Sequence, residues 1–381
     1  MHLVDTTLFY SPTSGGVRRY LSAKQAWLRD HTPWRHTIVV PGDRFRVVPG
    51  DVTTVPGYAL PGTFNYRLPL NPKLWGETLA ALEPDLLEVG DAFHPAWCAW
   101  RVAQRRGIPA VAFFHSNLPQ LIGRRLGSAS ERLVGRYVRW LYERFDAVLA
   151  PSRAMCDYLA SLGVQHAVYQ PLGVDTDVFS PARRTLDLRA QLGLAPETRL
   201  LVFAGRFAGE KNMPVLLQAF ARLGRPYHLV LIGGGRSARP NFNVSIVPFR
   251  RDSIEVASWL ASCDALVHAG TKETFGLVVV EAMACGRPVV ATRAGAISEI
   301  VDQSVGELAE PLDAASFADA IAALYERDLE AVGAAARAKV LQQFTWTQAL
   351  HTQLATYASV GVRGRIPVTA RPVIELRSRT L

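Results

Sequence analysis

The chain has 381 residues, of which 49% are hydrophobic, and a net charge of +9. This length and apolar content predict two folded domains of roughly 170 residues each and exclude a chain that is a disordered tail as a whole. The excess of basic residues favours anionic partners such as phosphates, an acidic membrane surface or nucleic acid. Both a zinc site and a disulfide framework are disfavoured, because no C-x-x-C pair occurs among the cysteines, Cys98, Cys156, Cys263 and Cys285.

The first half of the chain alternates short β-branched runs with segments of helical apolar spacing. Strands are predicted at residues 36–40, 86–89, 110–114 and 147–149, and helices at 17–29, 96–106 and 152–162. Such alternation is typical of an α/β fold in which helices wrap a parallel sheet.

The same alternation begins again after a segment rich in Pro, Gly and Asp at residues 171–181. The second half has predicted strands at 200–203, 229–232, 244–247, 265–267 and 288–291. We therefore expect two Rossmann-like domains that face a central cleft. The predicted limits are 1–172 for the first domain, 173–185 for a linker, 186–345 for the second domain, and 346–381 for a helix that crosses back to the first domain and a tail.

Ligands of open α/β sheets bind outside the carboxyl ends of the strands, so the chemistry is expected in the cleft. The first signal there is a turn at residues 11–17 that contains Gly15 and Gly16 and leads into a helix. Glycines let backbone amides approach a phosphate, and the amino end of a helix adds favourable potential. A plain strand-to-helix turn is the alternative.

A second signal, at residues 204–212, follows the first strand of the second half and contains Arg206 and Lys211. Both cations could stabilise the charge on a departing nucleoside diphosphate, in place of a divalent metal. The alternative is a solvated loop with ordinary surface cations.

The third and most specific signal is the segment from Glu273 to residue 286. We expect its apolar body to be a buried helix whose first turn offers the amides of Phe275, Gly276 and Leu277 to a phosphate or a sugar hydroxyl. Glu281 lies eight residues after Glu273, which corresponds to about 12 Å along a helix axis. A carboxylate among apolar residues needs a strong partner, so a neighbouring arginine is the alternative role for Glu281.

These three segments, in this order, resemble the GT-B-fold, retaining glycosyltransferases of family 4. The Gly-Gly turn, the G-R-x-x-x-E-K segment and the E-x7-E motif span essentially the whole chain. The family includes bacterial mannosyltransferases and sucrose and trehalose-type synthases. The resemblance implies an acceptor-side first domain and a nucleotide-sugar-binding second domain.

The resemblance also implies a role for each matching residue. Gly16, next to Gly15, would face the diphosphate that Arg206 and Lys211 bind. Glu273 would hold hydroxyls of the donor hexose, and Glu281 would hold the ribose. His115, which follows the strand at 110–114, would be the active-site histidine near the transferred sugar, although a lone histidine after an apolar strand is more often structural.

In this family the anomeric configuration is retained, and the leaving phosphate helps to deprotonate the acceptor, so no protein nucleophile, cofactor or metal is expected. No glycosidase-type carboxylate pair is identified in the sequence. The chain departs from the family pattern at Asn212, where glycine is usual, and at residues 294–296, where Ala-Gly-Ala replaces a Gly-Gly pair before Glu299.

The segments 114–119 and 268–276 resemble those of bacterial GDP-mannose-dependent α-mannosyltransferases, so we expect mannose from GDP-mannose. A UDP-sugar-dependent glucosyl, galactosyl or N-acetylglucosaminyl transferase is the alternative. Base recognition is expected in the loop at 247–252. The loop at 61–67, with Tyr66 and Arg67, suits a sugar or a phosphate head group of a lipid or glycan acceptor, or is an ordinary surface loop.

A basic amphipathic helix is predicted at residues 126–145, within the span from Arg101 to Arg144 that has nine Arg and two Glu. It would rest on an anionic membrane leaflet, or it is a solvated Arg face over a core stripe. Since the chain start has no signal-peptide pattern and no run of about 18 uncharged apolar residues occurs, we expect a cytoplasmic protein, soluble or peripheral at the inner face of the membrane.

Three rival functions remain open. A nucleotide-sugar epimerase would share the architecture, but the three motifs match transferases. A noncatalytic nucleotide-sugar-binding protein would be expected to lose one of Arg206, Lys211 and Glu273, and all three are present. Nucleic-acid binding is disfavoured because the arginines are dispersed and no binding module is recognisable.

Overall fold

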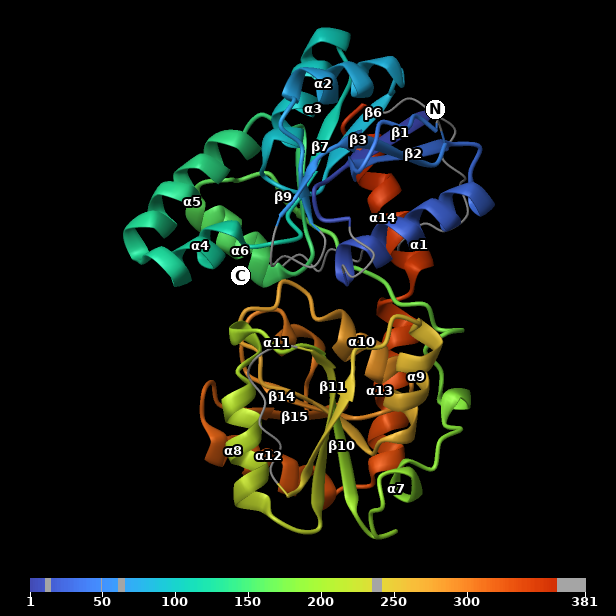
Figure 1. The fold of residues 1–381 in the computed structure, drawn as a ribbon, viewed down its shortest axis with the longest axis vertical. Coiled ribbons are helices and arrows are strands. Elements are labelled where there is room, and N and C mark those ends of the chain that lie inside the picture. The colour runs from blue at the N-terminus through green and yellow to red at the C-terminus, as the bar shows by residue number, and fades with distance from the viewer. Residues whose placement is uncertain (11–14, 49, 61–65, 235–241, 362–381) are drawn as a thin grey trace, which may run out of the picture.

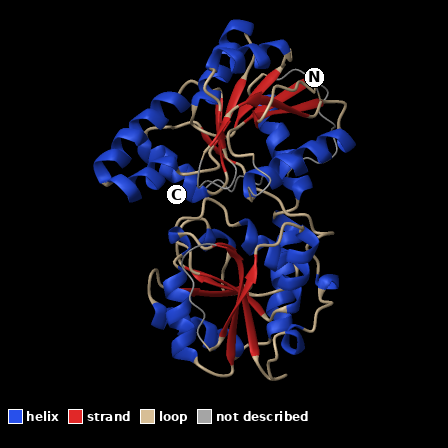
Figure 2. Cartoon of the chain, viewed as in Figure 1, coloured by secondary structure: helices blue, strands red, loops and turns tan. Residues whose placement is uncertain are grey.

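The computed structural model describes residues 1–10, 15–48, 50–60, 66–234 and 242–361. The chain forms two α/β lobes, one above the other in the view of Figure 1. In each lobe the strands form a central sheet with helices on both sides (Figure 2). The prediction of two parallel-sheet domains is confirmed.

The N-terminal lobe contains a seven-stranded parallel sheet in the order β3-β2-β1-β6-β7-β8-β9. The strands are β1 (His2–Thr6), β2 (Arg35–Gly42), β3 (Val52–Pro56), β6 (Leu86–Val89), β7 (Ala110–Phe113), β8 (Ala147–Ala150) and β9 (Ala167–Tyr169). Every residue of β6, β7 and β8 is buried, which is why these strands appear as short continuous apolar runs rather than as alternating patterns. A hairpin of β4 (Tyr58–Ala59) and β5 (Arg67–Leu68) stands apart from the sheet.

The C-terminal lobe contains a six-stranded parallel sheet in the order β12-β11-β10-β13-β14-β15. Its strands are β10 (Arg199–Arg206), β11 (Tyr227–Gly234), β12 (Val244–Pro248), β13 (Ala265–His268), β14 (Val289–Thr292) and β15 (Gly306–Ala309). The strand order reverses between β10 and β13, as it does between β1 and β6 in the other lobe. Ligands of open α/β sheets bind at this kind of position.

The helices of the N-terminal lobe are α1 (Gly16–His31), α2 (Pro72–Ala81), α3 (His94–Arg106), α4 (Leu118–Leu126), α5 (Ser128–Tyr142) and α6 (Arg153–Leu162). The helix predicted at residues 126–145 is present as α5, which is shorter than predicted at both ends, and residue 126 belongs to α4. Gly127, at φ +86°, ends α4 and precedes α5. Glycine adopts this left-handed backbone without the steric cost of a side chain, so the chain can turn between the two helices.

The C-terminal lobe has the short helices η1 (Pro181–Arg183), α7 (Leu188–Gln191), η2 (Gly209–Lys211) and α11 (Ile297–Ile300). Its longer helices are α8 (Met213–Leu223), α9 (Ser253–Ser262), α10 (Leu277–Ala284), α12 (Ala314–Tyr325) and α13 (Leu329–Gln343). None of the helices in the described part of the chain is long and apolar enough to cross a membrane.

The last helix, α14 (Trp346–Ser359), packs against α1 of the N-terminal lobe. A buried ionic cluster joins them: Lys24 Nζ lies 2.9 Å from both Asp5 Oδ2 and Glu88 Oε1. From α14, Gln353 Nε2 donates to Glu88 Oε2 at 2.9 Å, and the Tyr357 hydroxyl donates to the same carboxylate. Burial raises the pKa of Glu88 to about 7. Burial would also raise the pKa of Asp5, but Lys24 and His36 together outweigh it and lower that pKa to about 2. The cluster fixes α14 to the sheet of the opposite lobe.

Candidate active site

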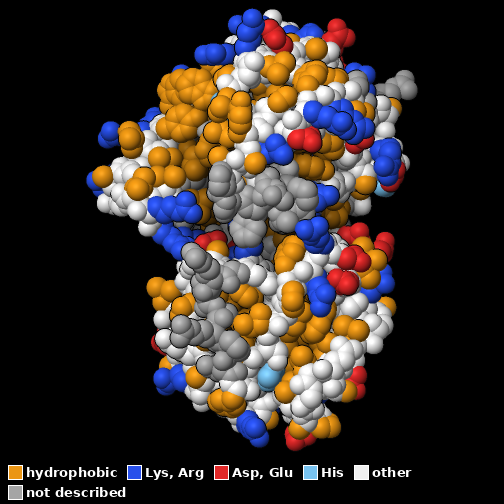
Figure 3. All heavy atoms as spheres, in the orientation of Figure 1, with side chains coloured by type: hydrophobic (Ala, Val, Ile, Leu, Met, Phe, Trp, Pro, Cys, Tyr) orange, Lys and Arg blue, Asp and Glu red, His pale blue; other side chains and the backbone are white. Residues whose placement is uncertain are grey.

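Loops at the carboxyl ends of both sheets meet between the lobes, where the molecule narrows (Figure 3). Several hydrogen bonds and ion pairs between described residues cross this cleft. They include the Arg19–Glu281 ion pair, the Arg124 Nη1–Glu210 Oε2 ion pair at 3.1 Å, the bond from Thr274 Oγ1 to the His115 carbonyl at 3.1 Å, and the bonds from the Arg153 and Ala154 amides to Glu299 at 2.9 and 2.7 Å. The cleft is therefore built from both lobes.

Three helices that begin at the cleft, α1, α8 and α10, have no side-chain N-cap and no acidic residue in the first turn. The amino ends of α1 and α10 are also close together, since a Cβ on Gly16 would lie 3.1 Å from Leu277 Cδ1. The free first-turn amides of a helix bind anions, and the helix dipole favours negative charge there. Gly16 and α10 thus offer two converging anion-binding ends.

The segment that contains Glu273 and Glu281 differs from its predicted form in one respect. The helix begins only at Leu277, and Gly276, at φ +101°, is its N-cap. The amide of Phe275 therefore lies before the helix and not in its first turn. The expected rise of about 12 Å between the two glutamates assumed a helix over all eight positions, whereas residues 274–276 precede α10.

Glu273 lies between two basic side chains. The Lys211 ammonium forms an ion pair with it, and His268 Nε2 lies 3.2 Å from its Oε1. Burial alone would raise the pKa of this carboxyl, but Lys211 and His268 outweigh burial, so the pKa of Glu273 lies well below its ordinary value. Glu273 is an ionised acceptor at neutral pH.

His268 ends β13 and belongs to the site, although the sequence suggested no role for it. Its Nδ1 accepts a hydrogen bond from the Gly270 amide at 3.2 Å, so Nε2 carries the proton that faces Glu273. The only available signal was the position of a histidine at the carboxyl end of a strand, five residues before Glu273.

The cation loop follows β10 as predicted. Arg206 is the last residue of β10 and is exposed, while Lys211 ends η2. Asn212 has φ +50°, a left-handed conformation, and its Nδ2 donates to the Ala269 carbonyl at 2.9 Å. Asparagine tolerates this conformation better than most residues, so the departure from the usual glycine keeps the path of the loop.

Glu281 is buried in α10, and its partner is Arg19 from α1 of the opposite lobe. Burial raises the pKa of Glu281, and the Arg19 guanidinium opposes this shift without cancelling it. The expectation that this carboxylate needs a strong partner is met by an arginine 262 positions away in the chain.

His115 follows β7 and lies where the two lobes meet. Its ring stacks on Phe113 at 3.9 Å between centroids and is tilted against Tyr20 at 4.9 Å. Burial, together with the charge of Lys24, lowers the pKa of His115 to about 3. The imidazole is therefore neutral at physiological pH and can act in hydrogen bonding but not as a cation.

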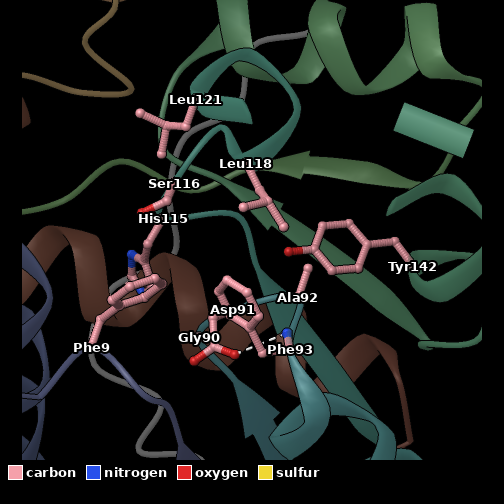
Figure 4. Close-up of a pocket in the computed structure, with 10 residues that line it drawn as sticks. All are labelled: Phe9, Gly90, Asp91, Ala92, Phe93, His115, Ser116, Leu118, Leu121 and Tyr142. Atoms are coloured by element: carbon pink, nitrogen blue, oxygen red, sulfur yellow. Dashed lines mark hydrogen bonds between the residues drawn. The ribbon is translucent and has the colours of Figure 1, made fainter. Parts of the chain in front are cut away.

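A small, mostly apolar pocket adjoins His115; its cavity volume is about 20 Å³, and it is partly open to solvent. Figure 4 shows Phe9 and His115 on one side, and Leu118 and Tyr142 on the other. The lining residues are Phe9, Gly90, Asp91, Ala92, Phe93, His115, Ser116, Leu118, Leu121 and Tyr142. Asp91 holds this wall together, because it accepts hydrogen bonds from Thr7 Oγ1 and from the Leu8 and Phe93 amides at 2.6 to 3.1 Å.

The two predicted acceptor residues lie near this pocket but are placed differently. The Tyr66 ring contacts Phe9 edge-on at 5.7 Å. Arg67 Nη1 donates to the Gly57 carbonyl at 2.9 Å, so its guanidinium helps to hold the β4–β5 hairpin. Residues 61–65 of the predicted acceptor loop, and 11–14 of the glycine turn, lie outside the described residues. Within the described ranges, no group of three or more His, Cys, Asp or Glu could hold a metal ion.

The sequence is similar to known proteins over both lobes. Residues 14–178 match the family model described as Glycosyltransferase Family 4, and residues 198–327 match the model described as Glycosyl transferases group 1. The GDP-mannose-dependent alpha-mannosyltransferase of Mycobacterium tuberculosis (strain CDC 1551 / Oshkosh) is 31% identical over 302 residues, which cover 75% of each protein. The chain belongs to glycosyltransferase family 4.

Two further proteins resemble this family 4 glycosyltransferase over almost its whole length. The GDP-mannose-dependent alpha-(1-6)-phosphatidylinositol dimannoside mannosyltransferase of M. tuberculosis (strain ATCC 25177 / H37Ra) is 29% identical over 384 residues, covering 96% of this chain and 98% of that protein. The structure of Anabaena HepE in complex with UDP and glucose superposes with a TM-score of 0.75 and 21% identity, covering 94% of this chain and 100% of that chain. The fold of the family 4 enzyme is GT-B.

Proposed function

We propose that this glycosyltransferase moves mannose from GDP-mannose to an alcohol of a lipid or glycan acceptor, with retention of the anomeric configuration and without a metal ion. One observation carries the proposal. Glu273 is held ionised by Lys211 and His268, in a cleft where uncapped helix amino ends converge. Two similar proteins named as GDP-mannose-dependent enzymes support the choice of donor.

The first step of the proposed mechanism is the breaking of the bond between the sugar C1 and the diphosphate oxygen. The amides at the amino ends of α1 and α10 would hold the diphosphate, and Arg206 and Lys211 would stabilise the charge that it gains. The Lys211 ammonium has three N–H donors, so it can keep its pair with Glu273 while it contacts a phosphate.

In the same step the acceptor oxygen bonds to C1 on the face that the diphosphate leaves. The acceptor proton passes to a phosphate oxygen of the leaving group, so no protein nucleophile takes part. Glu273 would accept hydrogen bonds from hydroxyls of the mannose, and Glu281 would accept them from the ribose. Neutral His115 would accept or donate one hydrogen bond beside the transferred sugar.

The decisive test is a donor screen in the presence of a metal chelator. GDP-mannose, UDP-glucose, UDP-galactose and UDP-N-acetylglucosamine would be compared by calorimetry and thermal shift, and products formed on lipid and glycan acceptors would be identified by mass spectrometry. We expect GDP-mannose to give the largest stabilisation and a product heavier by one hexose. Stronger binding of a UDP sugar would replace the donor assignment with the UDP-dependent alternative.

For the acceptor, we propose that its apolar part lies against the pocket beside His115 and that the surface of α4 and α5 contacts an anionic membrane. Exposed apolar side chains on these helices include Leu126 and Leu133, which are 72% and 67% exposed. Basic residues alternate with them, at positions 124, 125, 132 and 136. Apolar and basic side chains also lie side by side over this part of the upper lobe in Figure 3, a combination that favours an anionic interface.

Flotation with liposomes of neutral lipid, with and without anionic lipid, tests the membrane contact. The double variant Leu126→Glu/Leu133→Glu should lose binding to anionic liposomes. Leu312→Glu is a matched control, because Leu312 is 66% exposed and lies in the opposite lobe. Wild-type flotation that does not depend on anionic lipid would leave α4 and α5 as an ordinary solvated surface.

A further inference from the structure

Helix α1 brings a charged side chain into the cleft in addition to the amides of its first turn. Arg19 lies one helical turn after Gly16, and its Nη1 donates to Glu281 Oε1 of the opposite lobe. The Glu281 side chain is 3% exposed, whereas that of Arg19 is 35% exposed. One end of the pair is thus enclosed by protein, while part of the arginine side chain remains exposed to solvent.

A purely structural role explains only part of this arrangement. A buried carboxylate needs a cation or several donors, and Arg19 meets this need for Glu281. However, the cation comes from the helix whose amino end lies against Leu277, the residue at which α10 begins. Both helix ends are uncapped, so an anion bound between them would lie close to the guanidinium.

The electrostatics of the proposed complex also call for a cation at this point. If Glu281 binds the ribose, its negative charge lies beside the diphosphate of the same nucleotide, and like charges at such a separation repel. A guanidinium has five N–H donors in a planar fork and pairs with carboxylates and phosphates alike. Arg19 can therefore keep one N–H on Glu281 and direct another to a phosphate oxygen.

We propose that Arg19 is a donor-binding residue whose guanidinium bridges the Glu281 carboxylate and the diphosphate of the bound nucleotide. This inference rests on the proposed function, because it assumes that a nucleotide diphosphate occupies the cleft. It does not depend on the base or on the sugar. It gives the N-terminal lobe a charged contact with the donor and makes Arg19 and Glu281 a single unit.

The test compares a nucleoside diphosphate with its nucleoside in a double-mutant cycle. Dissociation constants of GDP and guanosine, UDP and uridine, and ADP and adenosine would be measured by calorimetry for the wild type, Arg19→Gln, Glu281→Gln and the double variant. Melting temperatures would show that each variant is folded. Arg29→Gln is the matched control, because Arg29 lies on the same helix but at its exposed carboxyl end.

The informative comparison is Glu281→Gln against the double variant, because there Arg19 no longer has a buried charge to neutralise. We expect the added Arg19→Gln change to weaken diphosphate binding about tenfold, as loss of one charge-assisted contact would, and to leave nucleoside binding unchanged. Arg19→Lys, which keeps the charge but not the fork, should lie between wild type and Arg19→Gln.

Two results would refute the inference. If the added change weakens neither ligand, or weakens both equally, Arg19 serves only to neutralise Glu281. Failure of the proposed function is a different result, since the wild type would then bind none of the three nucleoside diphosphates.

Discussion

Glu299 provides the sharpest test of how the two lobes meet. It lies in α11 of the C-terminal lobe, and its two carboxylate oxygens accept hydrogen bonds from the Arg153 and Ala154 amides, at 2.9 and 2.7 Å. These amides belong to the first turn of α6 in the N-terminal lobe, where Ser152 caps the Met155 amide. Glu299 therefore completes the cap of a helix in the opposite lobe.

The contact has a magnitude that can be estimated. Hydrogen bonds to a charged group and the interaction with a helix dipole together contribute about 1–2 kcal/mol at an exposed helix end. Because the contact spans the lobes, Glu299→Ala should lower the ratio of closed to open molecules by about 5- to 30-fold. We expect a lower kcat at saturating donor, a larger radius of gyration by small-angle scattering, and a partial effect for Glu299→Gln.

The control is Glu197, an exposed residue just before the amino end of β10, at the end of the sheet opposite the cleft. Glu197→Ala removes the same side chain from the same lobe and should change neither kcat nor the radius of gyration. If Glu299→Ala also matches the wild type in both measurements, the contact does not hold the lobes together.

Three further outcomes follow from the charges of the site. Lys211→Met should reduce kcat by at least 100-fold. Because Lys211 lowers the pKa of Glu273, the substitution should also move the acid limb of the pH–rate profile to higher pH. An acid limb that does not move would contradict the pairing of Lys211 with Glu273. Burial lowers the pKa of His115 to about 3, so profiles of wild type and His115→Gln between pH 5 and 8 should have the same shape and differ only in height. Burial raises the pKa of Glu88 from 4.5 to about 7, so the contribution of Glu88 to stability is present below about pH 4.5 and is lost as the pH rises through 7. Over this range the melting temperature of the wild type should fall more than that of Glu88→Gln, by the equivalent of on the order of 3 kcal/mol. Parallel curves of melting temperature against pH would contradict the shift.

Local sequence patterns were sufficient to place residues relative to the nearest strand or helix. Gly16, Lys211 and Glu273 lie at or near strand or helix ends, and such positions can be recognised from apolar runs and glycines. The exact ends of elements were less well predicted: the helix expected at residues 126–145 is α5, which spans residues 128–142.

Contacts between distant segments could not be predicted in this way. Arg19 and Glu281 are 262 positions apart, and the Arg153 amide and Glu299 are 146 apart. A carboxylate in an apolar helix showed that a partner was needed, but neither spacing nor composition could select one arginine among many. His268 was missed for a related reason, since its role depends on which nitrogen the Gly270 amide occupies.

The position of α1 links the donor site to the helix that returns from the C-terminal lobe. Tyr20 follows Arg19, and its ring contacts both His115 and Trp346, the first residue of α14, at 4.9 and 6.2 Å. Trp27 Nε1, two turns further along α1, donates to Thr347 Oγ1 at 3.2 Å. Any rotation of the lobes that moves the start of α14 must therefore act on the helix that presents Gly16 and Arg19. If Gly16 and Arg19 bind the diphosphate as proposed, closure of the lobes and assembly of that site would be one movement, because the same helix takes part in both.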